Sequence, residues 1–402
     1  MQWRGSSPVS FLRATQRVDT WGAVVVFWGC AFALVYAYLG YPVLLASLTR
    51  RLAAAASEDG TAPKVSVIIA AYNEEECIAE KIRNTFAQEY PAHLLECIVV
   101  SDGSTDRTAE IARTIADQRL RVIEQSPNQG KCLCLNRAVR EATGDVLVFT
   151  DANSMLAPSA LACLTRHFAD PRIGLVSGKG QFVERVHGTV LVVTNTYLRY
   201  EEFIREREKR LGYIVWADGA LYALRRPLFR DLEPMHSNDF LHPIQAVLAG
   251  YRVTFEPTAI FREATSGSAR GEFKRQARMI AQGMYVLATE GPKLLARKRW
   301  TVAWQLLSHR VLRWMGPLFL LGALGASAYL APGSPLYLAL FVAQVAFYTV
   351  ALGGALAEGL GVKARSLAVP YYFCLVNLAG VVGFCRVVAG NVQGTWTPVR
   401  SA

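Results

Sequence analysis

Long apolar stretches flank a mixed, charge-rich middle of the chain. Residues 22–47 contain no charged residue over 26 positions, which is long enough for a helix to cross the roughly 30 Å hydrocarbon core of a membrane. Three further apolar runs lie at residues 314–331, 336–357 and 367–385. Segments rich in glycine and proline separate these runs. The pattern predicts one membrane helix over residues 22–49 and three more within residues 314–390.

The middle region alternates between short apolar runs and helical patterns. Three runs are typical of buried strands that end in turns: VSVIIAAYN (65–73), LECIVVSDGS (95–104) and DVLVFTDANS (145–154). Helical patterns occupy residues 74–88 and 105–118, and a further helix is predicted at about residues 194–210. Strands that alternate with helices indicate βαβ units, and continuous Val/Ile runs suit strands covered on both faces. We therefore expect an α/β domain with a mainly parallel sheet.

The remaining segments complete the expected organisation. Residues 1–21 form an N-terminal segment, and residues 53–62 form a linker of small and polar residues before an α/β domain at 63–290. Residues 301–313 mix Trp, Leu, His and Arg, which is typical of an amphipathic helix in the membrane interface. Residues 391–402 form a tail.

The charge of the chain fits a membrane surface. The net charge is +11, and basic residues cluster beside apolar segments, at residues 50–51, 293–299 and 363–365. This placement favours anionic lipid headgroups and a cytoplasmic α/β domain over a nucleic-acid partner. If all four helices span, the C-terminus lies outside, and the sequence leaves the side of the C-terminus open.

The eight cysteines do not indicate a zinc site or a disulfide framework. No two of them form a C-x-x-C pair, and three lie in apolar segments. The pattern predicts reduced thiols that serve as small buried residues.

An acidic residue stands at the end of each of the three predicted strands. The strand ends read Ala71-Tyr72-Asn73-Glu74, Ser101-Asp102-Gly103-Ser104 and Thr150-Asp151-Ala152-Asn153. The carboxyl ends of parallel strands meet at one edge of the sheet, where ligands bind in open α/β folds. At any one strand end, the Asp, Asn, Gly and Ser residues could simply form a turn or a helix cap. Three acidic ends at one edge point instead to a shared crevice.

An acidic crevice would repel a phosphate-bearing ligand unless a cation lay between them. Mg²⁺ or Mn²⁺ suits this place because hard cations prefer oxygen ligands and bridge carboxylates to phosphate oxygens. Lys131 in NQGKCLCLNRA begins a helix after a glycine turn. Its ammonium is expected to reach a phosphate or an acidic neighbour.

Four motifs stand in order within 90 residues: VSVIIAAYNEEE, SDGSTDRT, NQGKCLCLNRA and GDVLVFTDANS. Together they resemble the nucleotide-sugar-binding half of the family 2 glycosyltransferases, whose fold is GT-A. The layout resembles polysaccharide synthases such as cellulose, hyaluronan and poly-N-acetylglucosamine synthases, which carry a cytoplasmic GT-A domain between membrane helices. The resemblance covers residues 63–290 and implies an α/β GT-A domain flanked by transmembrane helices.

The resemblance implies a donor site at the strand ends. Ala71, Tyr72 and Glu74 would border the nucleotide, and Asp102 would contact its uracil or ribose. Lys131 would also belong to the nucleotide-sugar site.

The metal motif of the family is altered in this chain. Asp151 matches the first carboxylate of the Asp-x-Asp motif, and Asn153 stands at the third position. An amide oxygen ligates Mg²⁺ without bringing a charge, so the affinity for metal is expected to be lower.

The segment HSNDFLHPIQAVLAGYRVTFEP resembles the family's Glu-Asp segment. The resemblance maps the catalytic base to Asp239, with Asn238 in place of the Glu. An inverting transfer needs a carboxylate that takes the proton of the acceptor hydroxyl. The alternative is that Asp239 only caps the helix that follows. His242, one turn further, is either a partner of this base or a structural residue.

Two further segments resemble the acceptor and diphosphate regions. WADGALYALRR contains Trp216 and Asp218, and Trp216 would either stack on a sugar ring or be a buried aromatic. GEFKRQARMIAQG aligns with the Gln-x-x-Arg-Trp segment; Arg278 keeps the arginine, Arg275 replaces Gln and Met279 replaces Trp. The two arginines share a helix face and would hold the departing diphosphate, unless the helix is simply solvated and basic. Loss of the Trp argues against long-chain polymerisation.

These expectations define a multi-pass cell-membrane enzyme. It would transfer a hexose or N-acetylhexosamine, with inversion, from a nucleotide-diphosphate sugar to a glycan or lipid-linked acceptor, in synthesis of an extracellular polysaccharide or glycolipid. The expected partners are the donor, the acceptor and membrane lipids. One alternative is a non-catalytic membrane receptor or scaffold that keeps the nucleotide-sugar pocket. A nucleotidyltransferase is a weaker alternative because AAYNEEE is not the Gly-rich basic loop that such an enzyme needs.

Overall fold

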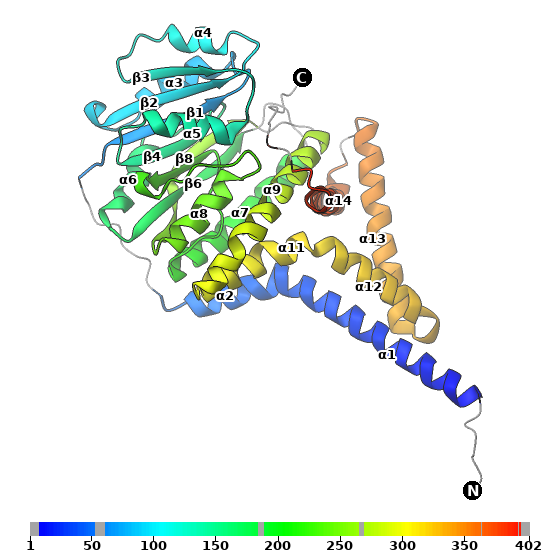
Figure 1. The fold of residues 1–402 in the computed structure, drawn as a ribbon. Helices are drawn as coiled ribbons and strands as arrows, with labels where there is room; N and C mark the ends of the chain where they lie inside the picture. The colour runs from blue at the N-terminus through cyan, green and yellow to red at the C-terminus, as the bar shows by residue number, and fades with distance from the viewer. Residues whose placement is uncertain are drawn as a thin grey trace. The chain divides into compact units, whose positions relative to one another are not determined.

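The computed structural model describes residues 8–52, 61–183, 189–264, 269–362, 364–392 and 394. Most of the linker 53–62, Lys363, and parts of the segments 1–21 and 391–402 lie outside the described residues. The chain divides into two compact units (Figure 1): one comprises Met1–Leu44 and Leu307–Val381, the other Leu45–Leu306 and Val382–Ala402.

The second unit is built on one eight-stranded sheet, in the order β3-β2-β1-β4-β7-β6-β8-β5. Its strands are β1 Val65–Ala71, β2 Leu95–Asp102, β3 Leu120–Gln125, β4 Val146–Asp151, β5 Met155–Leu156, β6 Ile173–Val183, β7 Leu221–Arg225 and β8 Arg252–Ala264. Strands β3, β2, β1 and β4 are parallel, β6 pairs parallel with β8, and β7 runs antiparallel between β4 and β6. The mainly parallel sheet predicted from the sequence is thus confirmed.

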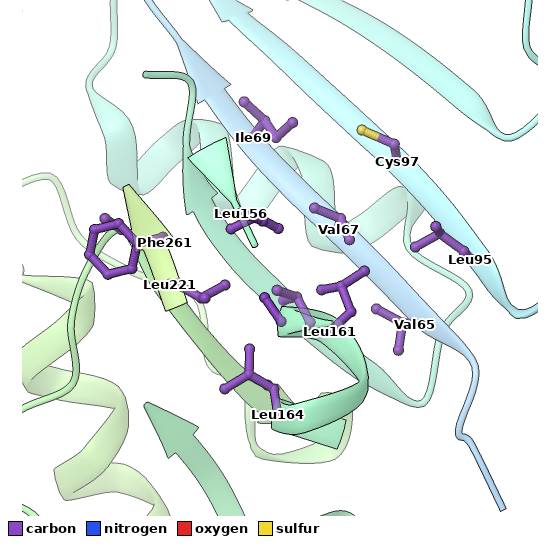
Figure 2. Packing of buried hydrophobic residues seen from close by; sticks show 14 of the residues in the cluster. Val65, Val67, Ile69, Leu95, Cys97, Leu156, Leu161, Leu164, Leu221 and Phe261 are labelled. Atoms are coloured by element: carbon purple, nitrogen blue, oxygen red, sulfur yellow. The ribbon is translucent and has the colours of Figure 1, made fainter. Parts of the chain in front are cut away.

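The central strands are apolar because both of their faces are covered. All seven residues of β1 are buried, and Val65, Val67 and Ile69 have no exposed surface. They pack with side chains from neighbouring strands and from the helix that contains Leu161 and Leu164 (Figure 2). Burial of each such side chain stabilises the fold by about 1.5–3 kcal/mol relative to exposure.

Helices of this unit are α3 Ile78–Phe86, α4 Thr108–Arg113, α5 Lys131–Glu141, α6 Ala160–Thr165, α7 Thr189–Glu208, α8 Asn238–Leu248, α9 Ala269–Ala296 and α10 Trp300–Leu306. The helices α3 and α4 are shorter than the predicted 74–88 and 105–118. Glu74 and Glu75 stay outside α3 because their backbone N–H groups donate to the side chains of Thr108, the first residue of α4, and of Asp106 in the loop before it. Tertiary contacts therefore replace the first predicted helical turn.

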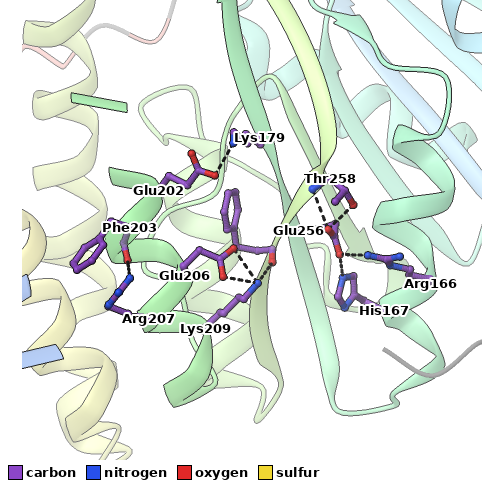
Figure 3. Close-up of polar contacts among 11 residues, drawn as sticks. Arg166, His167, Lys179, Glu202, Phe203, Glu206, Arg207, Lys209, Glu256 and Thr258 are labelled. Atoms are coloured by element: carbon purple, nitrogen blue, oxygen red, sulfur yellow. Dashed lines mark hydrogen bonds and ion pairs between the residues drawn. The ribbon is translucent and has the colours of Figure 1, made fainter. Parts of the chain in front are cut away.

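Helix α7 is fixed to the second half of the sheet by ion pairs (Figure 3). Lys179 of β6 lies 2.5 Å from Glu202 of α7. Beyond α7, Lys209 pairs with Glu206 and bonds to the carbonyl of Phe255 in β8. These contacts determine where α7 presents its polar side chains.

In the other unit, the predicted apolar runs are helical. They form α1 Pro8–Val35, α2 Tyr41–Thr49 (which continues into the second unit), α12 Gly316–Leu330, α13 Pro335–Gly359 and α14 Ala368–Val388, with the short α11 Leu312–Trp314 before α12. Phe27 packs against Ala323 and Ala326, and the Trp28 indole donates to Tyr337. Within the part of the chain that the structure describes, four helical segments are long and apolar enough to cross a membrane: Thr20–Thr49, Gly316–Gly333, Pro335–Gly359 and Ala368–Val388. All eight cysteines are free thiols, and the predicted burial holds only for Cys97, Cys132 and Cys134.

Candidate active site

The loops after β1 and β2 are locked together by reciprocal hydrogen bonds. The Asn73 backbone N–H donates to Ser104 Oγ at 3.0 Å, and Asn73 Oδ1 accepts from the Thr105 N–H at 2.7 Å. Asn73 adopts a left-handed φ of 55°, which Asn tolerates better than most residues. The half-buried Tyr72 and Glu74 flank this lock, while Ala71 is buried and offers only its backbone. The edge predicted to border the nucleotide is therefore rigid.

Asp102 is fully buried, and its carboxylate is occupied by the loop that follows β3. It accepts the backbone N–H groups of Gln129 and Gly130 at 2.8 Å each, and the Gln125 side-chain amide at 2.7 Å. Gly130 has φ 96°, and α5 starts at the next residue, Lys131. The geometry assigns Asp102 to fixing this loop and so placing Lys131. Direct contact of Asp102 with a nucleotide stays a prediction.

Lys131 and Asp151 form an ion pair at the end of β4. Lys131 Nζ lies 2.5 Å from Asp151 Oδ1 and 3.5 Å from the carbonyl of Gly219. Both side chains keep about a quarter of their surface exposed, at 23% and 28%. Burial alone would lower the pKa of Lys131, but the Asp151 charge and hydrogen bond raise it overall. The ammonium therefore stays charged at neutral pH.

Asp239 lies within the first turn of α8, and the N-cap of this helix is Ser237. The Ser237 hydroxyl donates to the Asp239 carboxylate. Burial raises the pKa of Asp239, and among its charged neighbours are Lys131 and Asp151. Ser237 occupies the N-cap position without a side-chain capping hydrogen bond, so the alternative that Asp239 supports the start of α8 stays open beside its role as the base.

Gly219 packs directly against the candidate base. A Cβ at Gly219 would lie 2.9 Å from Asp239 Oδ2, a separation that forces one of the two groups to move. Misplacement of a reacting group by about 1 Å costs on the order of 100-fold in rate. We expect Gly219→Ala to lower the turnover number for sugar transfer by about tenfold or more. Gly333→Ala, whose Cβ meets nothing within 4 Å, is the control. A Gly219→Ala variant as fast as Gly333→Ala would contradict this constraint.

The residues around Asp239 explain the family departure at Asn238. Asn238 donates to the Tyr222 hydroxyl at 2.7 Å, and that hydroxyl contacts His242 Nδ1 at 2.9 Å. His242 has no exposed surface, and burial lowers its pKa to about 3. A neutral Asn fits this buried uncharged network, whereas a carboxylate would need a counter-charge. These contacts place His242 in the buried network of Tyr222 and Asn238, which favours the second alternative, a structural role.

Arg278 and Arg275 of α9 have different environments. Arg275 forms a two-pronged ion pair with Glu272, with hydrogen bonds of 2.9 and 2.8 Å. Among the described residues, Arg278 has no hydrogen bond or ion pair. Burial lowers the pKa of Arg278, and the carboxylates of Asp151 and Asp239 act on it in the opposite sense. Arg278 is thus the arginine available to an incoming anion.

The two residues predicted on the acceptor side, Trp216 and Asp218, have different environments. Trp216 is 7% exposed and packs on Phe240, with ring centroids 4.9 Å apart, so the buried-aromatic alternative holds. Asp218 is half-buried, and its carboxylate lies 4.0 Å from the guanidinium of Arg205 in α7. The backbone N–H of Asp218 donates to the Ser177 hydroxyl. Burial raises the pKa of Asp218. Stacking of a sugar on Trp216 therefore requires a rearrangement of its surroundings.

The oxygen-rich end of β4 fits a hard cation that shares its ligands with a phosphate. Asp151 contributes a carboxylate and the exposed Asn153 an amide oxygen, both suited to Mg²⁺ or Mn²⁺. Within the ranges that the structure describes, no three His, Cys, Asp or Glu residues are grouped to hold a metal ion. A cation here would need further oxygens from the diphosphate.

Sequence reasoning missed two residues beside Asp151. Glu263, near the end of β8, accepts from Asn153 Nδ2 at 3.1 Å and from Ser154 Oγ at 3.3 Å. Lys81 of α3 is fully buried, donates to Thr150 Oγ1 at 2.8 Å and also contacts the Ser154 carbonyl. A signal for Lys81 was present, because it lies between Ile78 and Ile82 on the apolar face of α3. Pairing of β5 with β8 brings Glu263 to the site, and the two-residue β5 has no sequence signature.

The chain is similar to known glycosyltransferases over part of its length. Residues 66–231 match the model of glycosyl transferase family 2. Poly-beta-1,6-N-acetyl-D-glucosamine synthase of Staphylococcus aureus (strain COL) is 24% identical over 241 residues, covering 58% of this chain and 58% of the relative. The Staphylococcus epidermidis synthase is 24% identical over 243 residues, covering 59% of this chain and 58% of its own length. The chain therefore spans under two thirds of the length of these relatives.

A solved structure extends the likeness over most of the chain. It is a mannosyltransferase from Pyrobaculum calidifontis in complex with GDP-Man and Mn²⁺, with 25% identity and a TM-score of 0.68. The likeness covers 91% of this chain and 99% of the mannosyltransferase. This fold is GT-A, as the motifs predicted. Residues 66–231 therefore form a glycosyl transferase family 2 domain, within a chain that shares its fold with this mannosyltransferase.

Proposed function

We propose that the chain transfers a hexose or N-acetylhexosamine, with inversion, from a nucleotide-diphosphate sugar to a glycan or lipid-linked acceptor. The observation that carries the proposal is the placement of four charged side chains. Lys131 pairs with Asp151 and contacts the carbonyl of Gly219, against which Asp239 packs, and the charges of Asp151 and Asp239 act on Arg278. A base, two cations for a leaving diphosphate and a carboxylate for a divalent cation thus lie in one site.

The chemistry follows from these residues. Asp239 takes the proton of the acceptor hydroxyl as its oxygen attacks the anomeric carbon, on the face opposite the diphosphate. The bond from the anomeric carbon to the diphosphate oxygen breaks in the same displacement, and the electron pair leaves with the nucleoside diphosphate. Arg278 and Lys131 stabilise the charge that develops there. A divalent cation held by Asp151 and Asn153 would neutralise part of that charge.

The expected donor and acceptor follow from the relatives. The mannosyltransferase neighbour holds GDP-Man and Mn²⁺, and the curated relatives are named for an N-acetylglucosamine polymer. Both sugars fall in the proposed donor class. Four helices of spanning length support a multi-pass membrane enzyme, and the basic clusters beside them support a cytoplasmic catalytic domain. An acceptor beside the bilayer follows from this placement.

Transfer should depend on pH through Asp239. Burial raises the pKa of this carboxyl and the Asp151 charge adds to the effect, while Ser237 and Lys131 oppose it. A base acts only when deprotonated, so the rate falls as pH drops through this pKa. The acid limb of turnover should therefore lie above the ordinary value of about 3.9 for Asp. Ser237→Ala removes a hydrogen bond that holds the pKa down and should move the limb to higher pH. Superimposable profiles of turnover against pH would contradict the assignment.

A direct assay tests the proposal as a whole. Purified full-length chain in detergent is incubated with a panel of UDP- and GDP-sugars, Mg²⁺ or Mn²⁺ and membrane lipid extract. Release of nucleoside diphosphate, lost in Asp239→Asn, is the expected result. Binding of a nucleotide-sugar with no release across the panel would instead favour the receptor alternative.

A further inference from the structure

Glu263 fixes the orientation of the altered metal motif. The side-chain amide of Asn153 turns its NH₂ group toward the Glu263 carboxylate, at 3.1 Å. If the Asn153 amide were rotated by 180°, its oxygen would face a carboxylate oxygen of Glu263 with no proton between them. The Glu263 carboxylate therefore excludes that orientation. The oxygen of Asn153 is consequently left on the side away from Glu263. Asn153 itself is exposed, so this oxygen is accessible to a ligand.

Glu263 is also anchored to the rest of the Asp151 loop. Its second carboxylate oxygen accepts from the hydroxyl of Ser154, which is fully buried. Lys81 of α3 contacts the carbonyl of the same serine. Burial and the nearby Asp151 carboxylate raise the pKa of Glu263 to about 7, and a divalent cation at this end of β4 would favour its charged form. Glu263 of β8 thus places a carboxylate beside the metal motif, whose third position is Asn153 instead of Asp.

We propose that Glu263 is a positioning residue for the divalent cation, which directs the Asn153 amide oxygen toward the cation and replaces the missing negative charge of the motif. This inference rests on the proposed function, because it assumes a cation that bridges the protein to a diphosphate. Residues that orient metal ligands without binding the metal contribute strongly to affinity. In this proposal, Asn153 and Glu263 together take the place of the second Asp in the family's metal motif.

Mn²⁺ binding provides the test independently of turnover. Full-length protein in detergent is titrated with Mn²⁺ in the presence of UDP or GDP, and free Mn²⁺ is followed by electron paramagnetic resonance against nucleotide alone. Glu263→Gln keeps a group that accepts from Asn153 but removes the charge. We expect it to weaken nucleotide-dependent Mn²⁺ binding by about 10- to 100-fold. Glu263→Ala removes the orienting acceptor as well and should weaken binding at least as much.

A charge exchange separates positioning from mere folding. Asn153→Asp alone places two carboxylates face to face and should bind Mn²⁺ no better than the wild type, because like charges disfavour ionisation of both. The double variant Asn153→Asp/Glu263→Gln restores one carboxylate and one amide in exchanged places and should recover most of the affinity. Glu110→Gln, an exposed carboxylate on α4, controls for net charge.

The outcomes distinguish the inference from the proposed function. Wild-type protein that binds no Mn²⁺ with either nucleotide would refute the proposed function itself. Wild-type binding that Glu263→Gln leaves unchanged would overturn only the role of Glu263. A double variant as weak as Glu263→Gln, or with the same lowered melting temperature, would assign Glu263 to folding and also overturn the inference.

Discussion

Replacing Asp239 by asparagine is expected to lower the turnover number by about 100- to 10,000-fold. The amide keeps the size of the side chain and accepts the Ser237 hydrogen bond, so the start of α8 should remain intact. It cannot take a proton from the acceptor hydroxyl at neutral pH. Transfer should therefore fail while donor binding survives. The measurement is release of nucleoside diphosphate under single-turnover conditions, alongside binding of the donor.

The matched control for this variant is Asp231→Asn. Asp231 is an exposed carboxylate paired with Arg140 on the surface, so its loss changes the charge equally without touching the site. Exposed ion pairs contribute only about 0–1 kcal/mol, so its melting temperature and turnover should stay near those of the wild type. If Asp239→Asn retained turnover close to Asp231→Asn, the base would have to be sought elsewhere, with Asp218 the nearest candidate by its interaction with Asp239.

The parallel half of the fold was predictable because its signals are local. A buried strand such as β1 needs an uninterrupted apolar run, and the turn that ends it needs residues such as Asn73. The resemblance to family 2 glycosyltransferases then implied that Asp151 and Asp239 belong to one site. This stays a prediction, and the charges of both carboxylates act on Lys131.

Other features depend on contacts between distant segments. The sequence offered two environments for Trp216, and packing on Phe240 decides between them. Burial of the Asp102 carboxylate depends on the backbone conformation of Gly130, which no residue pattern near Asp102 reports. Glu263 arrives through pairing of β8 with a strand of two residues. In each case the deciding partner is remote in the chain, beyond the reach of periodicity or local motifs.

Arg278→Ala is expected to have the other large effect, a loss of about 100- to 1,000-fold in turnover. This guanidinium is half-buried and lacks a hydrogen-bond partner among the described residues, so its positive charge is available to a developing diphosphate charge. Removing a donor that acts in the transition state lowers turnover more than it weakens donor binding. Arg278→Lys should recover only part of the loss, because an ammonium cannot reproduce the planar fork of guanidinium.

The neighbouring cations of α9 make this prediction specific. Arg275 is already held by Glu272 through two hydrogen bonds, so Arg275→Ala should reduce turnover far less than Arg278→Ala. Lys274 is exposed on the same helix, and Lys274→Ala removes an equal charge outside the site. If the reaction responded only to the net positive charge of α9, all three alanine variants would lose activity equally. Equal losses would place the diphosphate away from Arg278. A selective loss would follow from a guanidinium that has no hydrogen bond or ion pair among the described residues.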